Sequence, residues 1–357
     1  MNCLRTLCLS SLFVPALSAS FAPADSISFH PADGTKVSRS WSIKQELTLD
    51  EMNMTVNGQP LPMDIQMDMD MTNEMSVEVS DVFVSVKDGR PIEMRRTFDK
   101  LASDGHFAVE MPMMPDGGME QSITGKSELE GKTVKFAWDA EASQYERTYH
   151  ESEGEAELLE GLDEDMDVRG IAPGKDVATG DTWKVDVKAL RALLAPGGDL
   201  AIRPEKTGAE MQGMMPGMSG MGDLADMIGD ALEGEASAEY LGLQELEGGK
   251  FAVIKLKFDI SCNTDMADKM DEMMRELPEG MGSMKFEHID LEFGIEAEGT
   301  LHWDPALGMI HAADLSGKMK INMDMAMKMN AQGQDMAFEQ SMAMSGTIAI
   351  KQDVTKN

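Results

Sequence analysis

Cysteine is nearly absent from this chain. Only three of its 357 residues are cysteines, and Cys3 and Cys8 lie at the amino terminus, before or inside a short apolar stretch. If that stretch is removed, Cys262 stands alone and no disulfide can form within the chain. Stability must then come from a hydrophobic core, which a chain of this length can build. Cys262 shares its phase with apolar residues of a predicted strand, so we expect a buried, inert thiol.

Basic residues are also few. Lysine and arginine number 31 against 64 aspartates and glutamates, for a formal net charge of −33. This charge argues against nucleic acid and anionic membrane surfaces as partners, and it favours cationic ones. No apolar run beyond the amino terminus reaches the length of a membrane span. We therefore expect no nucleic-acid partner and no membrane span, and the oligomeric state stays open.

The sequence patterns of common catalytic sites are missing as well. There is no Gly-x-Ser-x-Gly, no His-Glu-x-x-His, no phosphate-binding glycine loop and no Cys-x-x-Cys, and the six histidines are scattered. We predict that the protein is not an enzyme and needs no cofactor. Residues 163–167 resemble the start of a calcium loop, but Val168 and Gly174 stand where that loop needs glycine and a carboxylate. A solvated acidic helix end is the favoured interpretation.

Residues 1–20 have the three parts of a secretory signal. Arg5 is the positive residue, Leu7 to Leu17 is the apolar stretch, and small residues follow it. The sequence therefore predicts a soluble protein exported to the periplasm or beyond.

Methionine is the residue that this chain has in abundance, with 35 copies. Many occupy alternate positions, as in Met63–Met71, Met319–Met329 and Met336–Met344, where polar residues fill most of the places between. Alternation with period two indicates strands with one apolar face. The odd residues from Met63 to Val79 should thus face a buried or concave side, with the polar residues between them in water.

The fold class that follows is mainly β (α+β), with long antiparallel meander strands in one or two strongly curved sheets or half-barrels. Turn signals such as Asp88-Gly89 and Asp304–Gly308 separate the strand-like runs. Changes of apolar phase predict bulges near Asp50-Glu51 and Ser80-Asp81. The predicted strands are 36–56, 63–87, 90–101, 119–130, 132–139, 143–150, 234–246, 249–262, 284–303, 308–330 and 334–351.

We predict two β units after the signal, 21–170 with an acidic linker and 171–357 with covering helices; one continuous sheet is the alternative. Amphipathic or acidic patterns predict four helices. Those near 219–232 and 265–277 carry methionine faces and could act, with the glycine-rich stretch from residue 211, as movable covers on the sheet. The predicted helices are 155–166, 187–195, 219–232 and 265–277.

Thr179-Gly180-Asp181-Thr182-Trp183, followed by Pro196-Gly197-Gly198-Asp199-Leu200, resembles a segment of exported bacterial β-rich proteins of unknown function, which start a strand with a similar Gly-Asp-Thr/Ser-Trp. The resemblance covers about twenty-five residues and implies an envelope location with no known activity. In architecture alone, the chain is similar to the bacterial lipoprotein-carrier half-barrel, in which helices line an apolar concave face. That likeness transfers no site residues.

The methionine rows admit three interpretations: core filling in a structural or interaction module, a concavity that binds an apolar small molecule or lipid, and a periplasmic Cu(I) site. We favour binding of an apolar or amphiphilic ligand without catalysis, because a copper site needs only a few convergent sulfurs. The candidate ligand-lining residues are Met63, Met67, Met69, Met71, Met266, Met270, Met273, Met274, Met323, Met325, Met327, Met342 and Met344. The candidate copper ligands are Met211, Met214, Met215, Met218 and Met221.

Overall fold

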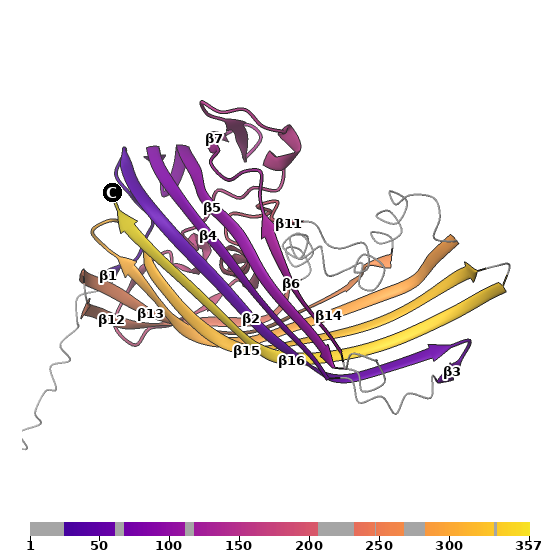
Figure 1. Ribbon diagram of the computed structural model, residues 1–357. Helices are drawn as coiled ribbons and strands as arrows, with labels where there is room; N and C mark the ends of the chain where they lie inside the picture. The colour runs from indigo at the N-terminus through magenta and orange to yellow at the C-terminus, as the bar shows by residue number, and fades with distance from the viewer. Residues whose placement is uncertain are drawn as a thin grey trace, which may run out of the picture.

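One open antiparallel sheet dominates the computed structural model (Figure 1). The structure describes residues 25–60, 68–110, 118–205, 232–246, 248–267, 283–331 and 334–357. The sheet has 14 strands, in the order β10-β12-β13-β14-β15-β16-β2-β4-β5-β6-β11, with β3, β7 and β8 off this path. A second sheet holds only β1 and β9. The mainly β fold with long, curved antiparallel strands is confirmed.

Most long strands lie close to the predicted ranges, but the strand predicted at 90–101 continues to Glu110 and the one predicted at 119–130 ends at Lys126. In chain order, the elements are β1 (Asp25–Ser26), β2 (Thr35–Val56), β3 (Gln59–Pro60), β4 (Asp68–Lys87), β5 (Arg90–Glu110), β6 (Gly118–Lys126), β7 (Thr133–Asp139), β8 (Gln144–Tyr149), η1 (Ala156–Leu159), η2 (Arg169–Ile171), β9 (Asp176–Val177), β10 (Thr182–Val185), η3 (Val187–Leu190), α1 (Arg191–Leu194), β11 (Arg203–Pro204), β12 (Glu233–Leu246), β13 (Gly249–Asp265), β14 (Ser283–Asp304), β15 (Met309–Ala331) and β16 (Gln334–Lys356).

Strands from both ends of the chain meet in the middle of the sheet. β16 pairs with β2 from Lys356↔Val37 to Phe338↔Val56, so the strands before and after residue 170 share one hydrogen-bonded sheet. The alternative of one continuous sheet therefore describes the backbone pairing. The division into folding units at residue 170 stays a prediction.

The predicted bulge at Asp50 is confirmed, because Ala343 pairs with Glu51 and Met344 with Leu49, which leaves Asp50 as the extra residue. The bulge predicted at Ser80-Asp81 is wrong. β2 and β4 pair there without a register shift, and the extra residue lies on β5 instead, at Asp99. The error has a physical cause. Asp81 is buried on the same side of the strand as Val79 and Phe83, but because it is charged, the sequence reads as a break in the apolar alternation.

Glycines allow the central strands to bend. A Cβ added to Gly299, Gly317 or Gly346 would lie 2.1, 2.2 and 1.8 Å from a carbonyl oxygen of the neighbouring strand. These residues stand on β14, β15 and β16, and each lies two paired residues further along the sheet than the one before. Such close backbone approach needs glycine. We call this diagonal of Gly299, Gly317 and Gly346 the glycine crease.

Among the described residues, helix is limited to short pieces. The helix predicted at 187–195 is present as η3 followed by α1. The helix predicted at 155–166 is wrong beyond the four residues of η1, because the acidic residues that follow are bonded to arginines in an irregular backbone. The helices predicted at 219–232 and 265–277 lie almost wholly outside the described residues. No helix in the described part of the chain is long and apolar enough to cross a membrane.

Candidate functional site

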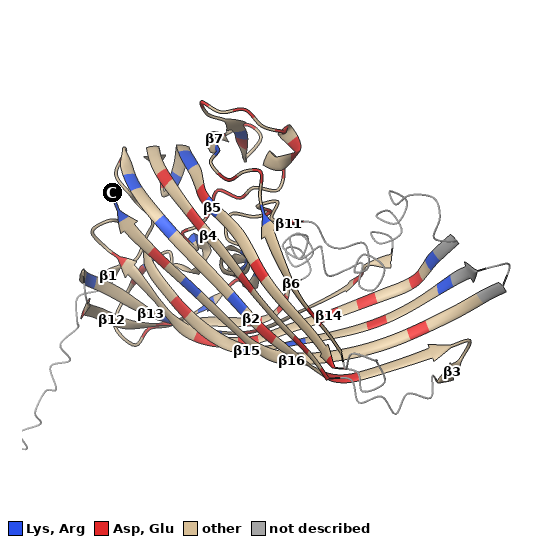
Figure 2. Cartoon of the chain, viewed as in Figure 1, with Lys and Arg blue, Asp and Glu red and all other residues tan. Residues whose placement is uncertain are grey.

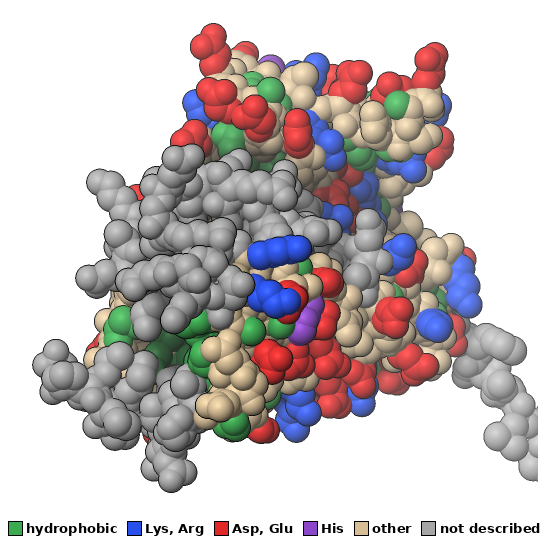
Figure 3. Space-filling model, turned by 90° about the vertical axis from the view of Figure 1, so that its right-hand side faces the viewer, with side chains coloured by type: hydrophobic (Ala, Val, Ile, Leu, Met, Phe, Trp, Pro, Cys, Tyr) green, Lys and Arg blue, Asp and Glu red, His purple; other side chains and the backbone are tan. Residues whose placement is uncertain are grey.

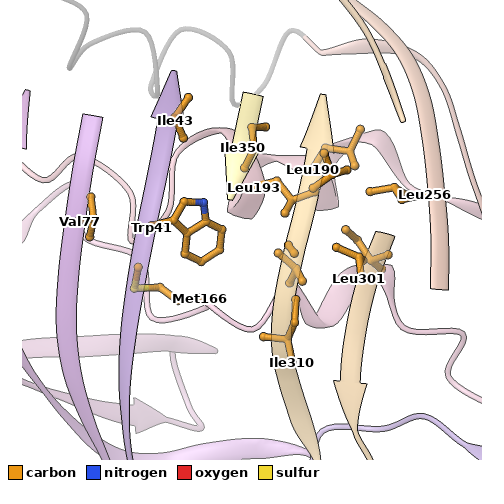
Figure 4. Packing of buried hydrophobic residues seen from close by; sticks show 14 of the residues in the cluster. Trp41, Ile43, Val77, Met166, Leu190, Leu193, Leu256, Leu301, Ile310 and Ile350 are labelled. Atoms are coloured by element: carbon orange, nitrogen blue, oxygen red, sulfur yellow. The ribbon is translucent and has the colours of Figure 1, made fainter. Parts of the chain in front are cut away.

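One half of the concave sheet face is covered by the chain itself. Residues 156–205, which we call the covering segment, contribute Met166, Leu190 and Leu193, each almost fully buried. Figure 4 shows these side chains opposite sheet residues such as Trp41 and Leu301. This half of the face is a packed core, with apolar side chains from both layers.

A buried ionic cluster, which we call the ionic anchor, joins the covering segment to the sheet. Asp81 lies between two arginines of adjacent strands: Arg39 Nε donates to Asp81 Oδ2 at 2.9 Å, and Arg96 Nε donates to Asp81 Oδ1 at 2.8 Å. Burial alone would raise the pKa of Asp81, but the two guanidinium groups outweigh it and hold that pKa below its usual value. Asp81 therefore stays charged in the core.

The covering segment supplies further partners for these arginines. Arg39 donates to the Asp167 carboxylate at 2.8 Å, and Arg96 donates to the backbone carbonyls of Asp163 and Glu164 at 3.0 and 3.1 Å. Gln352 of β16 donates to the carbonyl of Met166 at 3.0 Å. Three strands thus hold one short piece of backbone in place.

Glu164 completes the ionic anchor. Its side chain is buried, accepts a hydrogen bond from Arg169, and lies close to Asp165. Burial raises the pKa of Glu164 to about 7, in spite of Arg169. The solvated acidic helix end predicted for 163–167 is therefore wrong in its central feature, because Glu164 and Asp167 are buried beside arginines.

Val168 is held in a strained conformation within this segment. Its φ is 46° and its ψ is 41°, a left-handed conformation that β-branched residues rarely adopt. Such a residue costs about 1–3 kcal/mol and persists only where its surroundings hold it. Here the ionic anchor lies on one side and the η2 turn on the other.

The ionic anchor was not among the sequence predictions, although the sequence carries a signal for it. Arg39 lies in phase with Val37 and Trp41, Arg96 with Met94 and Phe98, and Asp81 with Val79 and Phe83. A charged residue at the apolar phase of a strand predicts a buried partner. Two arginines and one aspartate on neighbouring strands, all in that phase, indicate one shared cluster.

The other half of the concave face is lined by methionine and other apolar side chains from four neighbouring strands. Leu291, Met323, Met342 and Met52 form one cross-strand row of β14, β15, β16 and β2, and Phe286, Met327, Phe338 and Val56 form another. Ile289, Met325, Gln340 and Met54 form the row between them. We call these three rows the methionine face. Phe286 and Ile289 are buried, and the other members are half-buried.

The methionine face carries no charged side chain among its described residues. The residues between its members point to the opposite side of the sheet, where Glu51, Asp290, Glu292, Asp324 and Glu339 are all exposed. Figure 2 shows acidic positions along these strands, and Figure 3 shows hydrophobic side chains at the surface of this end of the molecule, beside acidic ones. The four strands therefore present one apolar and one polar face.

The predicted ligand-lining methionines divide into three groups. Met69, Met71 and Met344 are buried in the main core. Met323, Met325, Met327 and Met342 lie on the methionine face, and Met266 packs with three of them around Ala267, Phe286 and Ile289. Met63, Met67, Met270, Met273 and Met274 lie outside the described residues. Contact of any of these with a ligand stays a prediction.

The exposure predicted for the row from Met63 to Val79 is confirmed at most described positions, although Asn73 and Met75 are half-buried, as are the neighbouring Thr72 and Ser76. Met69, Met71, Val77 and Val79 are buried, whereas Asp68, Asp70, Glu74 and Glu78 are exposed. Cys262 is also buried, as predicted, and burial raises the pKa of its thiol.

The structure does not test the predicted Cu(I) site. Met211, Met214, Met215, Met218 and Met221, the candidate copper ligands, all lie outside the described residues. Within the described ranges, no group of three or more histidines, cysteines, aspartates or glutamates is placed to hold a metal ion.

The Gly-Asp-Thr-Trp stretch forms a turn that starts a strand. The Asp181 carboxylate accepts a hydrogen bond from the backbone N–H of Ala178 at 2.9 Å, and Gly180 has a φ of 91°. Trp183, in β10, donates its indole N–H to the carbonyl of Ile171 at 2.9 Å. This contact therefore joins β10, at the edge of the main sheet, to the η2 turn.

Comparison with known proteins identifies no family. No family model matches the chain, and no curated protein matches it. Among solved structures, one match is an outer membrane channel from Pseudomonas putida F1, with 9% sequence identity and a TM-score of 0.22, covering 92% of this chain and 97% of that one. At this TM-score the two backbones do not share a demonstrated fold, and the match carries no functional argument.

Proposed function

We propose that this protein is exported to the cell envelope and binds an apolar or amphiphilic partner on the methionine face, without catalysing a reaction. The signal-like residues 1–20 support export. The methionine face supports binding, because three adjacent rows of mostly apolar and mostly half-buried side chains lie beyond the half of the sheet that the covering segment fills. Methionine suits such a surface, since its flexible thioether adapts to partners of different shape.

The size of the methionine face sets the strength of the interaction. Four strands and about five residues of each make a surface of roughly 19 by 17 Å. Its side chains are already half-buried, so we take about 150 Å² as removable from water, with an equal area on the partner. Burial of about 300 Å² contributes roughly 8 kcal/mol before the entropic cost of association. Binding is therefore expected to be micromolar or weaker.

Titration with the neutral fluorescent probe N-phenyl-1-naphthylamine tests this function. The double variant Met323→Gln/Met342→Gln places two amides on the methionine face and should weaken probe binding about ten-fold, or about 1.4 kcal/mol. Ser341→Gln is the matched control, because it puts the same side chain on β16 next to Met342 but on the polar side. Equal binding by wild type and double variant, or none by either, would contradict the proposal. Tight Cu(I) binding without probe binding would favour the copper interpretation instead.

A further inference from the structure

Methionine is concentrated on the methionine face and is scarce in the main core. Six of the twelve residues in the three rows of the face are methionines, whereas the main buried cluster of the described residues has seven among its 52. That cluster consists mostly of valine, isoleucine, leucine and phenylalanine, so core filling alone does not explain the difference. The methionines of the face, which we call the face methionines, are Met52, Met54, Met323, Met325, Met327 and Met342.

The face methionines also differ from the core methionines in their exposure to water. Each face methionine is half-buried, so part of its surface is in contact with solvent. In the core, Met94, Met166 and Met309 have 0% of their surface exposed, and Met319 has 1%. A small oxidant dissolved in water therefore reaches the face methionines in the folded protein, but it reaches the core methionines only when the core opens.

The face methionines are neighbours, so chemical change at their sulfurs accumulates on one surface. Met323 pairs with Met342, and Met342 pairs with Met52. Met266 packs against the face methionines of β15 and leaves them half-buried. No charged side chain lies on the described part of this face, so each oxygen added to a sulfur places a new polar group in apolar surroundings.

We propose that the face methionines are a modification site for neutral hydroperoxides, and that their oxidation to sulfoxides switches off the binding of apolar partners. The site itself stands on exposure and position, whereas the switch rests on the proposed function. Repair by methionine sulfoxide reductases makes the change reversible.

The reaction is a two-electron oxidation of sulfur. A lone pair of the methionine Sδ attacks one peroxide oxygen, the O–O bond breaks and an S–O bond forms. Sulfur loses two electrons, and hydrogen peroxide is reduced to water. A neutral hydroperoxide suits this chain, because the net charge of −33 repels anionic oxidants but not neutral ones.

Peptide mapping by mass spectrometry tests the modification site on the purified protein. The folded protein is treated with hydrogen peroxide for a series of times, and each methionine is followed by its gain of one oxygen atom. We expect the face methionines to be oxidised at least about ten-fold faster than Met94, Met166, Met309 and Met319. The same treatment in denaturant should remove this difference. Equal rates in the folded protein would overturn the site.

Titration with N-phenyl-1-naphthylamine before and after oxidation tests the switch. Oxidation of the face methionines should weaken probe binding at least about ten-fold, and treatment with methionine sulfoxide reductases and a thiol reductant should restore it. Met323→Leu/Met325→Leu/Met342→Leu keeps the face apolar but cannot form these sulfoxides. This variant should bind the probe like the wild type and should keep most of that binding after oxidation.

Two further variants serve as controls for this test. Met119→Leu replaces a half-buried methionine of β6, outside the methionine face, and should lose probe binding on oxidation as the wild type does. Circular dichroism identifies a triple variant that fails to fold, and Met323→Leu/Met342→Leu then takes its place.

The outcomes separate the switch from the proposed function. If the leucine variant loses binding on oxidation as fully as the wild type, oxidation acts elsewhere and the switch is rejected. If oxidation of the face leaves probe binding unchanged, the proposed function stands and the switch is rejected. If the untreated protein does not bind the probe, the proposed function and the switch both fail, while the peptide map still decides the modification site.

Discussion

At the scale of single residues, the charged side chains inside the core determine how the covering segment is held. Asp81 pairs with both Arg39 and Arg96. On the covering segment, Asp167 pairs with Arg39 and Glu164 pairs with Arg169. Removing one partner of a buried pair leaves an uncompensated charge and costs about 3–5 kcal/mol. The segment with the strained Val168 is therefore attached by a few strong contacts as well as by apolar packing.

Glu164 should make stability depend on pH. Its folded pKa of about 7 lies above its ordinary value of 4.5, so the folded protein binds a proton between these values that the unfolded chain does not. Stability from this group is present at pH 5 and is lost as the pH rises through 7, by about 3 kcal/mol at most. The raised pKa of Asp167 acts in the same direction. The free energy of unfolding of Glu164→Gln should therefore differ less between pH 5 and pH 8 than that of the wild type.

Chemical denaturation at both pH values measures this effect. Exposed Glu235→Gln is the control and should keep the pH dependence of the wild type. If Glu164→Gln also keeps the full dependence, Glu164 is not the group responsible.

At the scale of the elements, the glycine crease allows β14, β15 and β16 to bend while they stay paired. Figure 1 shows these strands strongly curved, and the glycine crease lies within the covered half of the face, close to the methionine face. Long strands without such close approaches would follow a smoother twist.

Gly346→Ala should destabilise the protein strongly. Its new Cβ would lie 1.8 Å from the carbonyl oxygen of Glu46, so β16 and β2 must separate locally. We expect a loss of about 2–4 kcal/mol, comparable to other strained or overpacked sites. Gly294→Ala is the control, because its Cβ would meet nothing closer than 3.8 Å. Thermal melting of both variants measures the difference, and equal melting temperatures would show that the crease tolerates side chains.

At the scale of the whole molecule, acidic residues exceed basic ones by 33. Most exposed ion pairs contribute little, so repulsion among carboxylates should dominate the surface electrostatics. We expect the melting temperature to rise by several degrees between about 0.02 and 0.3 M NaCl, because the Debye length falls from about 20 to about 6 Å. Calorimetry measures this rise, with sucrose of equal osmolarity as the control. A fall in melting temperature with salt would show that local ion pairs dominate instead.

Much of the fold could be predicted from the sequence, because a strand with one buried face records that face as alternation with period two. The methionine rows, the turn at Asp304–Gly308 and the bulge at Asp50 are local features of this kind. The methionines of β15 and β16 that lie on the methionine face also came from alternation alone. Export, the absence of catalysis and the partner stay predictions.

Only the tertiary structure decided which rows become core and which stay half-buried. Met71 and Met323 stand in similar alternating patterns, but Met71 is buried in the main cluster while Met323 lies on the methionine face. The difference depends on where the covering segment crosses the sheet, and contacts between distant residues set that position. Asp81 shows the same limit: its sequence neighbours suggest a break in the strand, whereas Arg39 and Arg96, on two other strands, make its burial stable. Alternation records which side a residue faces, and only the folded chain determines what covers that side.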